Sequence, residues 1–234
     1  MYNTKNPPSN ILSEVGSLYH DFSFFGIENK QISEHYIQNQ KAKAPIITAY
    51  IAHARAKCES KNGFQTPSFT ELFCADGYYT MLANKLGCSP TFGIDNNCEK
   101  HLEKAQIISR RIGLEECNFI CSEITEEFTF EKTDIVANLG GLYHVSSPKE
   151  ILRNSFLLAR QFLIVQSVVS MATNDDTYYE KPAPGWTWGC RYSRSSFHKM
   201  ITEICPNIVD YHFNELTGNS RPEDRGSVYY LIKK

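Results

Sequence analysis

Four residues at the ends of two apolar runs could together bind a small ligand. The run "FTELFCADGYYT" (69–80) carries Glu71 within a strand-like stretch and continues into Ala75 and Gly77. The next run, "TFGIDNN", carries Asp95, 18 residues after Gly77. An ionised carboxylate in a buried strand is unfavourable unless it is paired, so Glu71 should face a cation. Asp95 is placed to accept hydrogen bonds from both hydroxyls of a ribose, each charge-assisted bond contributing about 1.5–3 kcal/mol.

Two nucleoside cofactors could use such a turn. NAD requires the pyrophosphate seat of a G-x-G-x-x-G pattern, but here Phe73, Ala75 and Tyr78 stand around the single glycine Gly77. S-adenosylmethionine has no phosphate, and its cationic amino group suits an acidic strand end. These residues therefore favour S-adenosylmethionine. An NAD-dependent oxidoreductase and a non-catalytic cofactor-binding protein are the alternatives.

A histidine and a tyrosine could take part in a methyl transfer. Transfer from a sulfonium is an in-line displacement, so most catalysis can come from holding the acceptor close and aligned, with proton removal as a secondary aid. His144 follows an expected strand at 134–139 and could act as a general base near neutral pH, or only hydrogen-bond its neighbours. Tyr143 could position the cofactor or the acceptor, or simply pack.

Aromatic residues in two other segments could contact the acceptor. Trp186, Trp188 and Arg191 in "PGWTWGCR" could form a stacking and charge-pairing lid, or the tryptophans could only anchor their loop. Tyr19 and His20 would reach the site if an N-terminal helix covers it, although core packing is the other interpretation for Tyr19.

A parallel sheet would bring these residues together. Apolar runs predict strands at 69–74, 91–95, 118–122, 134–139 and 161–169, and helical spacing predicts helices at 78–86, about 97–112, from 148 and about 193–203. Such alternation indicates a mostly parallel sheet covered on both faces, with ligands bound beyond the carboxyl ends of its strands. The last two apolar runs, "IVDYHFNEL" and "SVYYLIKK", have no helix between them and predict an antiparallel hairpin.

The N-terminal part differs from this alternation. Helical spacing after a Ser9 or Asn10 cap predicts one helix, and a second is expected to start at Pro45. The segment "CESKNGFQTPS" then breaks the pattern. We therefore expect a helical N-terminal cap over 1–66 and a cofactor-binding domain over 67–234.

The motifs in order resemble class I S-adenosylmethionine-dependent methyltransferases. "ELFCADGYYT" is similar to the cofactor turn of that superfamily, and "GIDNN", "NFICSEI" and "DIVANLGGLYH" follow in its order, so that the resemblance covers residues 68–234. It implies an α/β, Rossmann-like fold with a seven-stranded, mostly parallel sheet and an antiparallel C-terminal hairpin. The "LGGLYH" segment is similar to that of the tRNA wobble-uridine methyl- and carboxymethyltransferases. Phe73 departs from the pattern, because many members have a glycine there.

The resemblance implies a role for each matching residue. Glu71 would hold the methionine amino group, Asp95 and Asn96 would bind the ribose, and Glu123 would accept from the adenine amino group, flanked by Ser122 and Ile124. Asn138 and Leu139 would lie under the reacting sulfur. The residues lining the methionine moiety would be Phe73, Cys74, Ala75, Asp76 and Gly77.

The resemblance and the bulk composition also narrow the partners. Asn138 and "SVVS" stand where magnesium-dependent relatives place acids, so no metal is predicted. A net charge of -2 gives no general attraction to phosphate backbones, which disfavours nucleic acid as a partner. Relatives that methylate the exocyclic amines of nucleobases usually carry an Asn/Asp-Pro-Pro-aromatic run where this chain has "NLGG", so the resemblance implies a small-molecule acceptor, methylated at oxygen rather than nitrogen. A signal sequence and a membrane-spanning run are both missing, so we expect a cytoplasmic protein with no membrane partner. An oligomer is left open.

Overall fold

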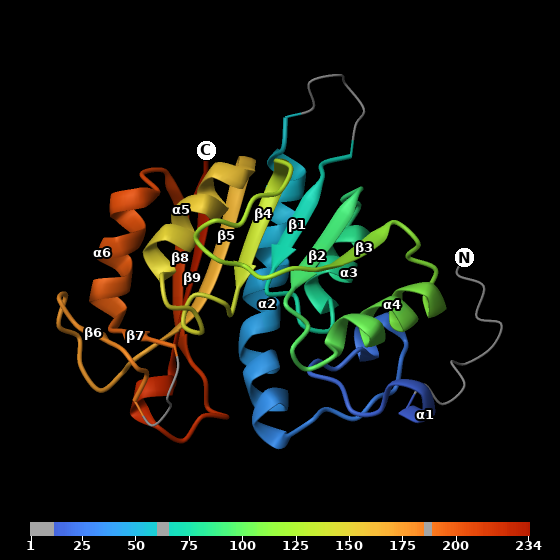
Figure 1. Ribbon diagram of the computed structural model, residues 1–234, viewed down its shortest axis with the longest axis horizontal. Helices are drawn as coiled ribbons and strands as arrows, with labels where there is room; N and C mark the ends of the chain where they lie inside the picture. Colours follow the sequence, from blue (N-terminus) through green and yellow to red (C-terminus); the bar gives the residue numbers. More distant parts are fainter. Residues whose placement is uncertain (1–11, 60–65, 185–188) are drawn as a thin grey trace.

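The computed structural model describes residues 12–59, 66–184 and 189–234. In this part of the chain, seven strands form one sheet in the order β3-β2-β1-β4-β5-β9-β8 (Figure 1). Strands β1 to β5 pair in parallel, and β9 lies antiparallel between β5 and β8. Their bounds are β1 Phe69–Leu72, β2 Thr91–Asp95, β3 Cys117–Cys121, β4 Thr133–Leu139, β5 Ala159–Val169, β8 Ile208–Glu215 and β9 Gly226–Lys233. The predicted fold class, with its antiparallel C-terminal hairpin, is confirmed.

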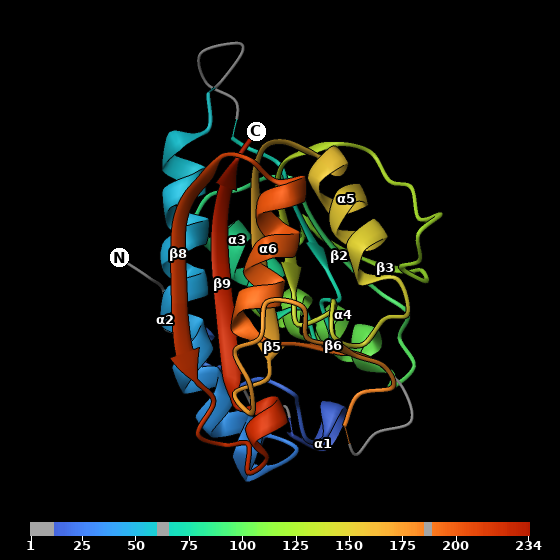
Figure 2. The same ribbon diagram turned by 90° about the vertical axis from the view of Figure 1, so that its left-hand side faces the viewer.

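Helices cover both faces of this sheet. In the two views, α2, α3 and α4 lie on one face and α5 and α6 on the other (Figures 1 and 2). The bounds are α1 Leu12–Val15, η1 Ser23–Phe25, α2 Glu34–Lys57, α3 Tyr78–Lys85, α4 His101–Arg111, α5 Pro148–Leu158, α6 Arg194–Ile204 and η2 Pro222–Asp224. A short pair, β6 Tyr179–Glu180 and β7 Arg191–Tyr192, stands apart from the main sheet. Among the described helices, none has both the length and the apolarity needed to cross a bilayer.

The continuous apolar run of β5 feeds both hydrophobic cores. Its side chains alternate between the faces, so Phe162 and Ile164 join the core under α2 and α3, whereas Leu163 and Val165 join the core under α5 and α6. Fully burying one such side chain is favourable by about 1.5–3 kcal/mol. A strand buried on both faces is therefore nearly continuously apolar, as its sequence indicated, and its buried polar residue Gln166 is hydrogen-bonded to Ser227 Oγ at 2.9 Å.

The N-terminal part departs from two expectations. Helix α2 begins at Glu34, with Pro45 inside it, so the predicted start at Pro45 was wrong. The preceding turns are polar, and they gave no apolar stripe to recognise. The described part of the first helix, α1, is Leu12–Val15 and is followed by Gly16 at a φ of +65°, whereas the predicted cap at Ser9 or Asn10 lies outside the described residues.

The predicted division at residue 66 does not separate two cores. Side chains of the N-terminal part, including Phe22, Ile47 and Ile51, belong to the same core cluster as Phe69 and Leu82 of the sheet domain. Helix α2 also contacts α3, β5, β8 and β9. A cap function for residues 1–66 therefore stays a proposal, and within it α2 is part of the main fold.

Candidate active site

A cavity of about 980 Å³ opens at the carboxyl ends of the parallel strands. Its walls come from the N-terminal segment, from α2, from the turns after β1 to β4 and from the loop between β8 and β9. The volume is near the upper end of the range of about 300–1,000 Å³ that is usual for ligand pockets. The residues predicted for the site that line this cavity are Tyr19, His20, Glu71, Phe73, Ala75, Asp95, Asn96, Glu123, Ile124, Leu139, Tyr143, His144 and Arg191.

The other predicted site residues do not line it. Cys74, Asp76, Gly77, Ser122 and Asn138 lie beside the cavity wall. Trp186 and Trp188 lie outside the described residues, so the predicted aromatic lid stays a prediction.

The turn after β1 has an unusual backbone. Phe73, Ala75 and Gly77 adopt φ angles of +64°, +46° and +73°, in the left-handed region that non-glycine residues rarely occupy. The Phe73 ring lies against Gly141, where an added Cβ would come within 1.9 Å of it. Phe73 thus occupies a glycine-like conformation, and the missing side chain at Gly141 makes room for its ring. Such strain is often found at ligand sites.

Gly77 is required by the packing of the sheet against this turn. A Cβ at this position would lie 2.3 Å from the Phe119 ring of β3. The predicted place of Gly77 beside the methionine moiety stays a prediction. Gly77 is also the N-terminal cap residue of α3.

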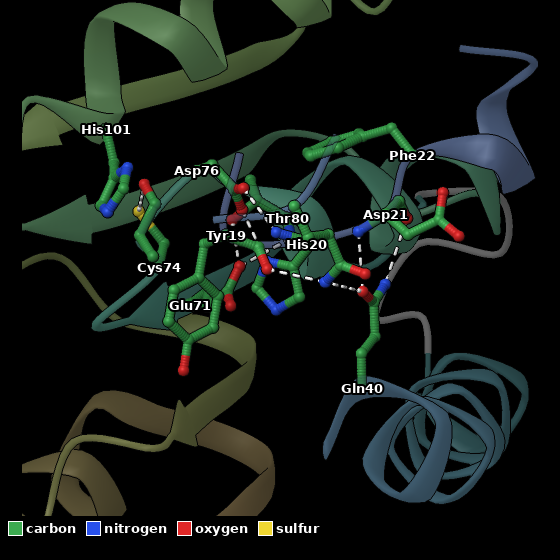
Figure 3. A network of polar contacts seen from close by, with 12 residues as sticks. Tyr19, His20, Asp21, Phe22, Gln40, Glu71, Cys74, Asp76, Thr80 and His101 are labelled. Atoms are coloured by element: carbon green, nitrogen blue, oxygen red, sulfur yellow. Dashed lines mark hydrogen bonds and ion pairs between the residues drawn. The ribbon is translucent and has the colours of Figure 1, made fainter. Parts of the chain in front are cut away.

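Glu71 caps the helix that follows it. Its Oε2 accepts hydrogen bonds from Thr80 N at 2.7 Å and Thr80 Oγ1 at 2.6 Å (Figure 3). Burial raises the pKa of Glu71 to about 8, against the effect of these hydrogen bonds, and the nearby Asp76 and Asp95 raise it further. Among the described residues no cation pairs with it. The predicted cationic partner would therefore have to come from a ligand.

Asp95 joins the turns after β1 and β2. Its Oδ2 accepts from Ala75 N at 3.1 Å, and its Oδ1 accepts from Asn97 N at 2.8 Å. Each carboxylate oxygen can accept a further hydrogen bond. The carboxylate is thereby held in place at the cavity wall, ready to accept from a diol.

A buried contact between His20 and Asp76 holds the N-terminal segment over this turn. His20 Nδ1 lies 2.5 Å from Asp76 Oδ1, and His20 N donates to Asp76 Oδ2 at 2.8 Å. Burial opposes ionisation of Asp76, but its contacts with His20 outweigh this and lower its pKa. Gln40 of α2 also bonds the backbone of Asp21, accepting from its N at 2.7 Å and donating to its O at 3.1 Å (Figure 3). Asp76 thus binds the protein's own segment, and that segment places Tyr19 and His20 at the cavity.

Asn138 and Leu139 point to opposite faces of β4. Asn138 Nδ2 donates to Ser155 Oγ of α5 at 2.9 Å, while Leu139 lines the cavity. Successive strand residues alternate in direction, so Asn138 faces α5 while Leu139 faces the cavity.

Tyr143 and His144 lie at the far side of the cavity, beside Arg191. The Arg191 guanidinium forms a buried ion pair with Asp224, with Nη2 at 2.6 Å from Oδ1, and lies over the Tyr143 ring at 5.1 Å from its centroid. Partial burial and the charges of Arg191 and Lys43 lower the pKa of His144. His144 is accordingly neutral near pH 7.

Comparison with known proteins identifies the fold and the family. A family model described as a methyltransferase domain matches residues 68–211. The chain belongs to this methyltransferase family. Its enzyme class, as predicted, is that of a methyltransferase, and no curated protein matches its sequence significantly.

Solved structures share the fold of this methyltransferase at low identity. The N-terminal domain of EvdMO1 with SAH bound has a TM-score of 0.69 and 17% identity, over 94% of this chain and 93% of that one. Magnesium protoporphyrin IX methyltransferase from Synechocystis PCC 6803 with bound SAH has a TM-score of 0.62 and 13% identity, over 92% and 97%. Coclaurine N-methyltransferase, bound to N-methylheliamine and SAH, has a TM-score of 0.57 and 13% identity, over 80% and 73%. These complexes and the family support S-adenosylmethionine as the cofactor.

The sequence analysis did not predict one wall of the methyltransferase cavity. The first turns of α2 contribute five polar side chains to it, and these are His35, Tyr36, Asn39, Gln40 and Lys43. The spacing of Tyr36, Gln40, Lys43 and Ile47 follows one helix face, and this period could have revealed the wall. The expected helix start at Pro45 hid it.

Proposed function

We propose that this protein transfers a methyl group from S-adenosylmethionine to a hydroxyl oxygen of a small polar acceptor. The observation that carries the proposal is that a single cavity has the carboxylates Glu71, Asp95 and Glu123 at one end and Tyr143 with His144 at the other. The acidic end suits a cationic cofactor, and the remaining volume suits a small acceptor.

The cofactor roles follow from the wall positions. Glu71 would take the methionine amino group on the oxygen that does not bond Thr80. Asp95 with Asn96 would take the ribose, and Glu123 with Ile124 the adenine. Phe73, Ala75 and Leu139 would contact the methionine end, whereas the other predicted residues would shape the wall from behind, namely Cys74, Asp76, Gly77, Ser122 and Asn138.

Charge favours an oxygen acceptor over an amine. Lys43 lies near His144, so a protonated amine would be repelled at this end of the cavity. A neutral imidazole can accept a hydrogen bond from a hydroxyl and align its oxygen. His144 would then act through alignment, with proton removal as a smaller contribution.

The likeness of "LGGLYH" to the tRNA wobble-uridine branch suggests an alternative function, that of a tRNA wobble-uridine-type methyl- or carboxymethyltransferase. A carboxylated cofactor of that kind would need a cationic partner, for which Arg191 is a candidate from the sequence. The Arg191 guanidinium is already ion-paired with Asp224, which makes it less suited to a second carboxylate. The small-molecule acceptor is therefore preferred.

Calorimetric titration tests the cofactor assignment. S-adenosylhomocysteine should bind the purified protein with micromolar affinity, and NAD should not bind in the same buffer. Asp95→Ala should weaken S-adenosylhomocysteine binding at least tenfold, since two charge-assisted hydrogen bonds of about 1.5–3 kcal/mol each are removed. Asp176→Ala, at an exposed loop aspartate, is the matched control. Binding of NAD alone, or equal affinity in Asp95→Ala, would contradict the assignment.

A second test concerns His144 once an acceptor hydroxyl has been found by screening. His144→Ala should lower kcat by up to about 100-fold, because misplacing a reacting group by about 1 Å can cost that much. Unchanged turnover would remove His144 from the mechanism.

A further inference from the structure

The cavity is divided by charge. Its half beside the ends of β1, β2 and β3 is lined by five carboxylates, Glu71, Asp95, Glu99, Glu123 and Glu126. Its other half, between α2 and the loop joining β8 to β9, is lined by three cations, Lys43, Arg191 and Arg221, and by Asp224. The two ends would therefore attract ligand groups of opposite sign.

The two arginines are matched by carboxylates of the protein itself. Arg191 pairs with Asp224 at 2.6 Å, and Arg221 Nε lies 3.7 Å from Asp224 and 3.8 Å from Glu223. These contacts hold the loop around η2 together, so they leave little charge for a ligand.

Lys43 differs from the arginines. Within the described ranges, no carboxylate lies at ion-pairing distance from its ammonium, and burial lowers its pKa to about 8. An unpaired ammonium in a partly desolvated cavity is unfavourable, so a ligand that supplied the opposite charge would be bound there.

Helix α2 fixes the lysine at this place. Tyr36, Gln40, Lys43 and Ile47 occupy one face of the helix and all line the cavity. Asn214 Nδ2 of β8 donates to the backbone oxygen of Ala42 at 2.9 Å, which ties this turn of the helix to the sheet edge. The ammonium is thus presented from a rigid element.

We propose that Lys43, together with the hydroxyls of Tyr36 and Tyr143, forms a subsite for an anionic group of the methyl acceptor, a carboxylate or a phosphate. The inference rests on the proposed function, because it assigns the anion to the acceptor. Burial raises the pKa of Tyr143 to about 12 and also raises that of Tyr36, so both phenols stay protonated and donate hydrogen bonds. One cation and two neutral donors match the oxygens of one anionic group.

Small anions test the subsite directly. The full chain, with ¹³C-labelled lysine, is titrated with sodium acetate and with inorganic phosphate at constant ionic strength, both alone and saturated with S-adenosylhomocysteine. The Lys43 side-chain signal is assigned by its loss in Lys43→Gln. We expect a saturable shift of this signal, with an apparent Kd at least tenfold below that of any response at the exposed Lys41 on the same helix.

Each outcome bears on the proposal. A response to acetate alone identifies a carboxylate acceptor, one to phosphate alone a phosphorylated acceptor, and one to both an anionic acceptor of either kind. A Lys43 signal that responds no more than Lys41 overturns the subsite. Lys43→Gln and its control Lys41→Gln should both keep S-adenosylhomocysteine affinity within twofold, and a greater loss in Lys43→Gln would move Lys43 to the cofactor site. Failure of wild-type protein to bind S-adenosylhomocysteine would instead contradict the proposed function. The anion titration of the unliganded protein would then still show whether Lys43 binds anions.

Discussion

Glu71 can serve the fold and the cofactor through different oxygens. Oε2 accepts both Thr80 donors and so caps α3, while Oε1 has no hydrogen-bond partner among the described residues. A carboxyl whose pKa is raised to about 8 is mostly protonated at neutral pH in the unliganded protein. Binding of a cofactor ammonium would favour the ionised form, so a proton should leave as the cofactor binds.

The pH dependence of binding follows from this shift. S-adenosylhomocysteine affinity should rise from pH 6 toward pH 8, by at most about tenfold per pH unit. Glu71→Gln should bind more weakly and without this rise. Calorimetry in two buffers of different ionisation enthalpy would measure the released proton, and a wild-type affinity that is constant over this range would exclude the role. The same raised pKa stabilises the unliganded fold most below the unfolded value of about 4.3, and this contribution is lost as pH rises through about 8.

The fold and the cofactor site also depend on the fit of the Phe73 ring against Gly141. Gly141→Ala would place a methyl group within 1.9 Å of the Phe73 ring, so the ring or the end of β4 must move. We expect a loss of about 1–3 kcal/mol in the free energy of unfolding, as for other overpacked sites, and weaker S-adenosylhomocysteine binding. The double variant Phe73→Gly with Gly141→Ala should recover both. If Gly141→Ala melts and binds like wild type, the contact does not constrain the site.

At the scale of elements, the pair of His20 and Asp76 docks the N-terminal segment onto the start of α3. Removing one partner of a buried hydrogen bond, so that the other is left unsatisfied, typically destabilises a protein by about 1–3 kcal/mol. Asp76→Asn should therefore expose residues 12–33 to limited proteolysis and weaken cofactor binding, since Tyr19 and His20 line the cavity. The exposed Asp21→Asn is the control. Equal cleavage of both variants would show that other contacts dock the segment.

The sign of the pH effect on this docking is opposite to that of Glu71. The pKa of Asp76 is lowered in the folded protein, so its contribution is present above the unfolded value of about 3.9 and is lost as pH falls through the lower folded value. Wild type and Asp76→Asn should thus differ in urea unfolding at pH 7 and converge in acid.

The strands could be predicted from the sequence more fully than the directions in which their side chains point. The apolar runs of β1 to β5 and the Asp95 turn were visible because they depend on local pattern. Asn138 was assigned to the site although alternation along β4 turns it toward α5. The contact between His20 and Asp76 could not be predicted, because it joins residues far apart in the sequence. The first turns of α2 were not recognised as helical, because the face they turn to the cavity is polar and so shows no apolar stripe.

At the scale of the whole molecule, the buried pair of Arg191 and Asp224 joins three separate segments. Arg191 follows the loop after β5, Asp224 lies between β8 and β9, and Arg191 Nη1 donates to the backbone oxygen of Tyr143 after β4 at 3.4 Å. The pair therefore fixes the half of the cavity that is lined by Lys43, Arg191 and Arg221, through contacts with all three segments.

The net charge of the chain, -2, does not reveal that one half of the cavity is acidic and the other basic.

Breaking this pair should destabilise the whole fold. Asp224→Asn removes the charge opposite a fully buried guanidinium, so we expect a loss of about 3–5 kcal/mol, or roughly 6–20 °C in Tm for a chain of this size. The nearby and less buried Glu223→Gln should change Tm far less, because its contact with Arg221 is 3.8 Å long. Thermal unfolding followed by circular dichroism would decide, and a Tm within about 2 °C of wild type in Asp224→Asn would rule out this role.

The fit of Phe73 against Gly141 also has an evolutionary consequence. A side chain at position 141 and a phenyl ring at position 73 exclude each other, so the two positions should change together among relatives. A relative with alanine at 141 should carry glycine or another small residue at 73. For protein engineering, the exchanged pair would keep the strand ends filled while opening the wall of the cofactor cavity, which could admit donors bulkier than the natural sulfonium.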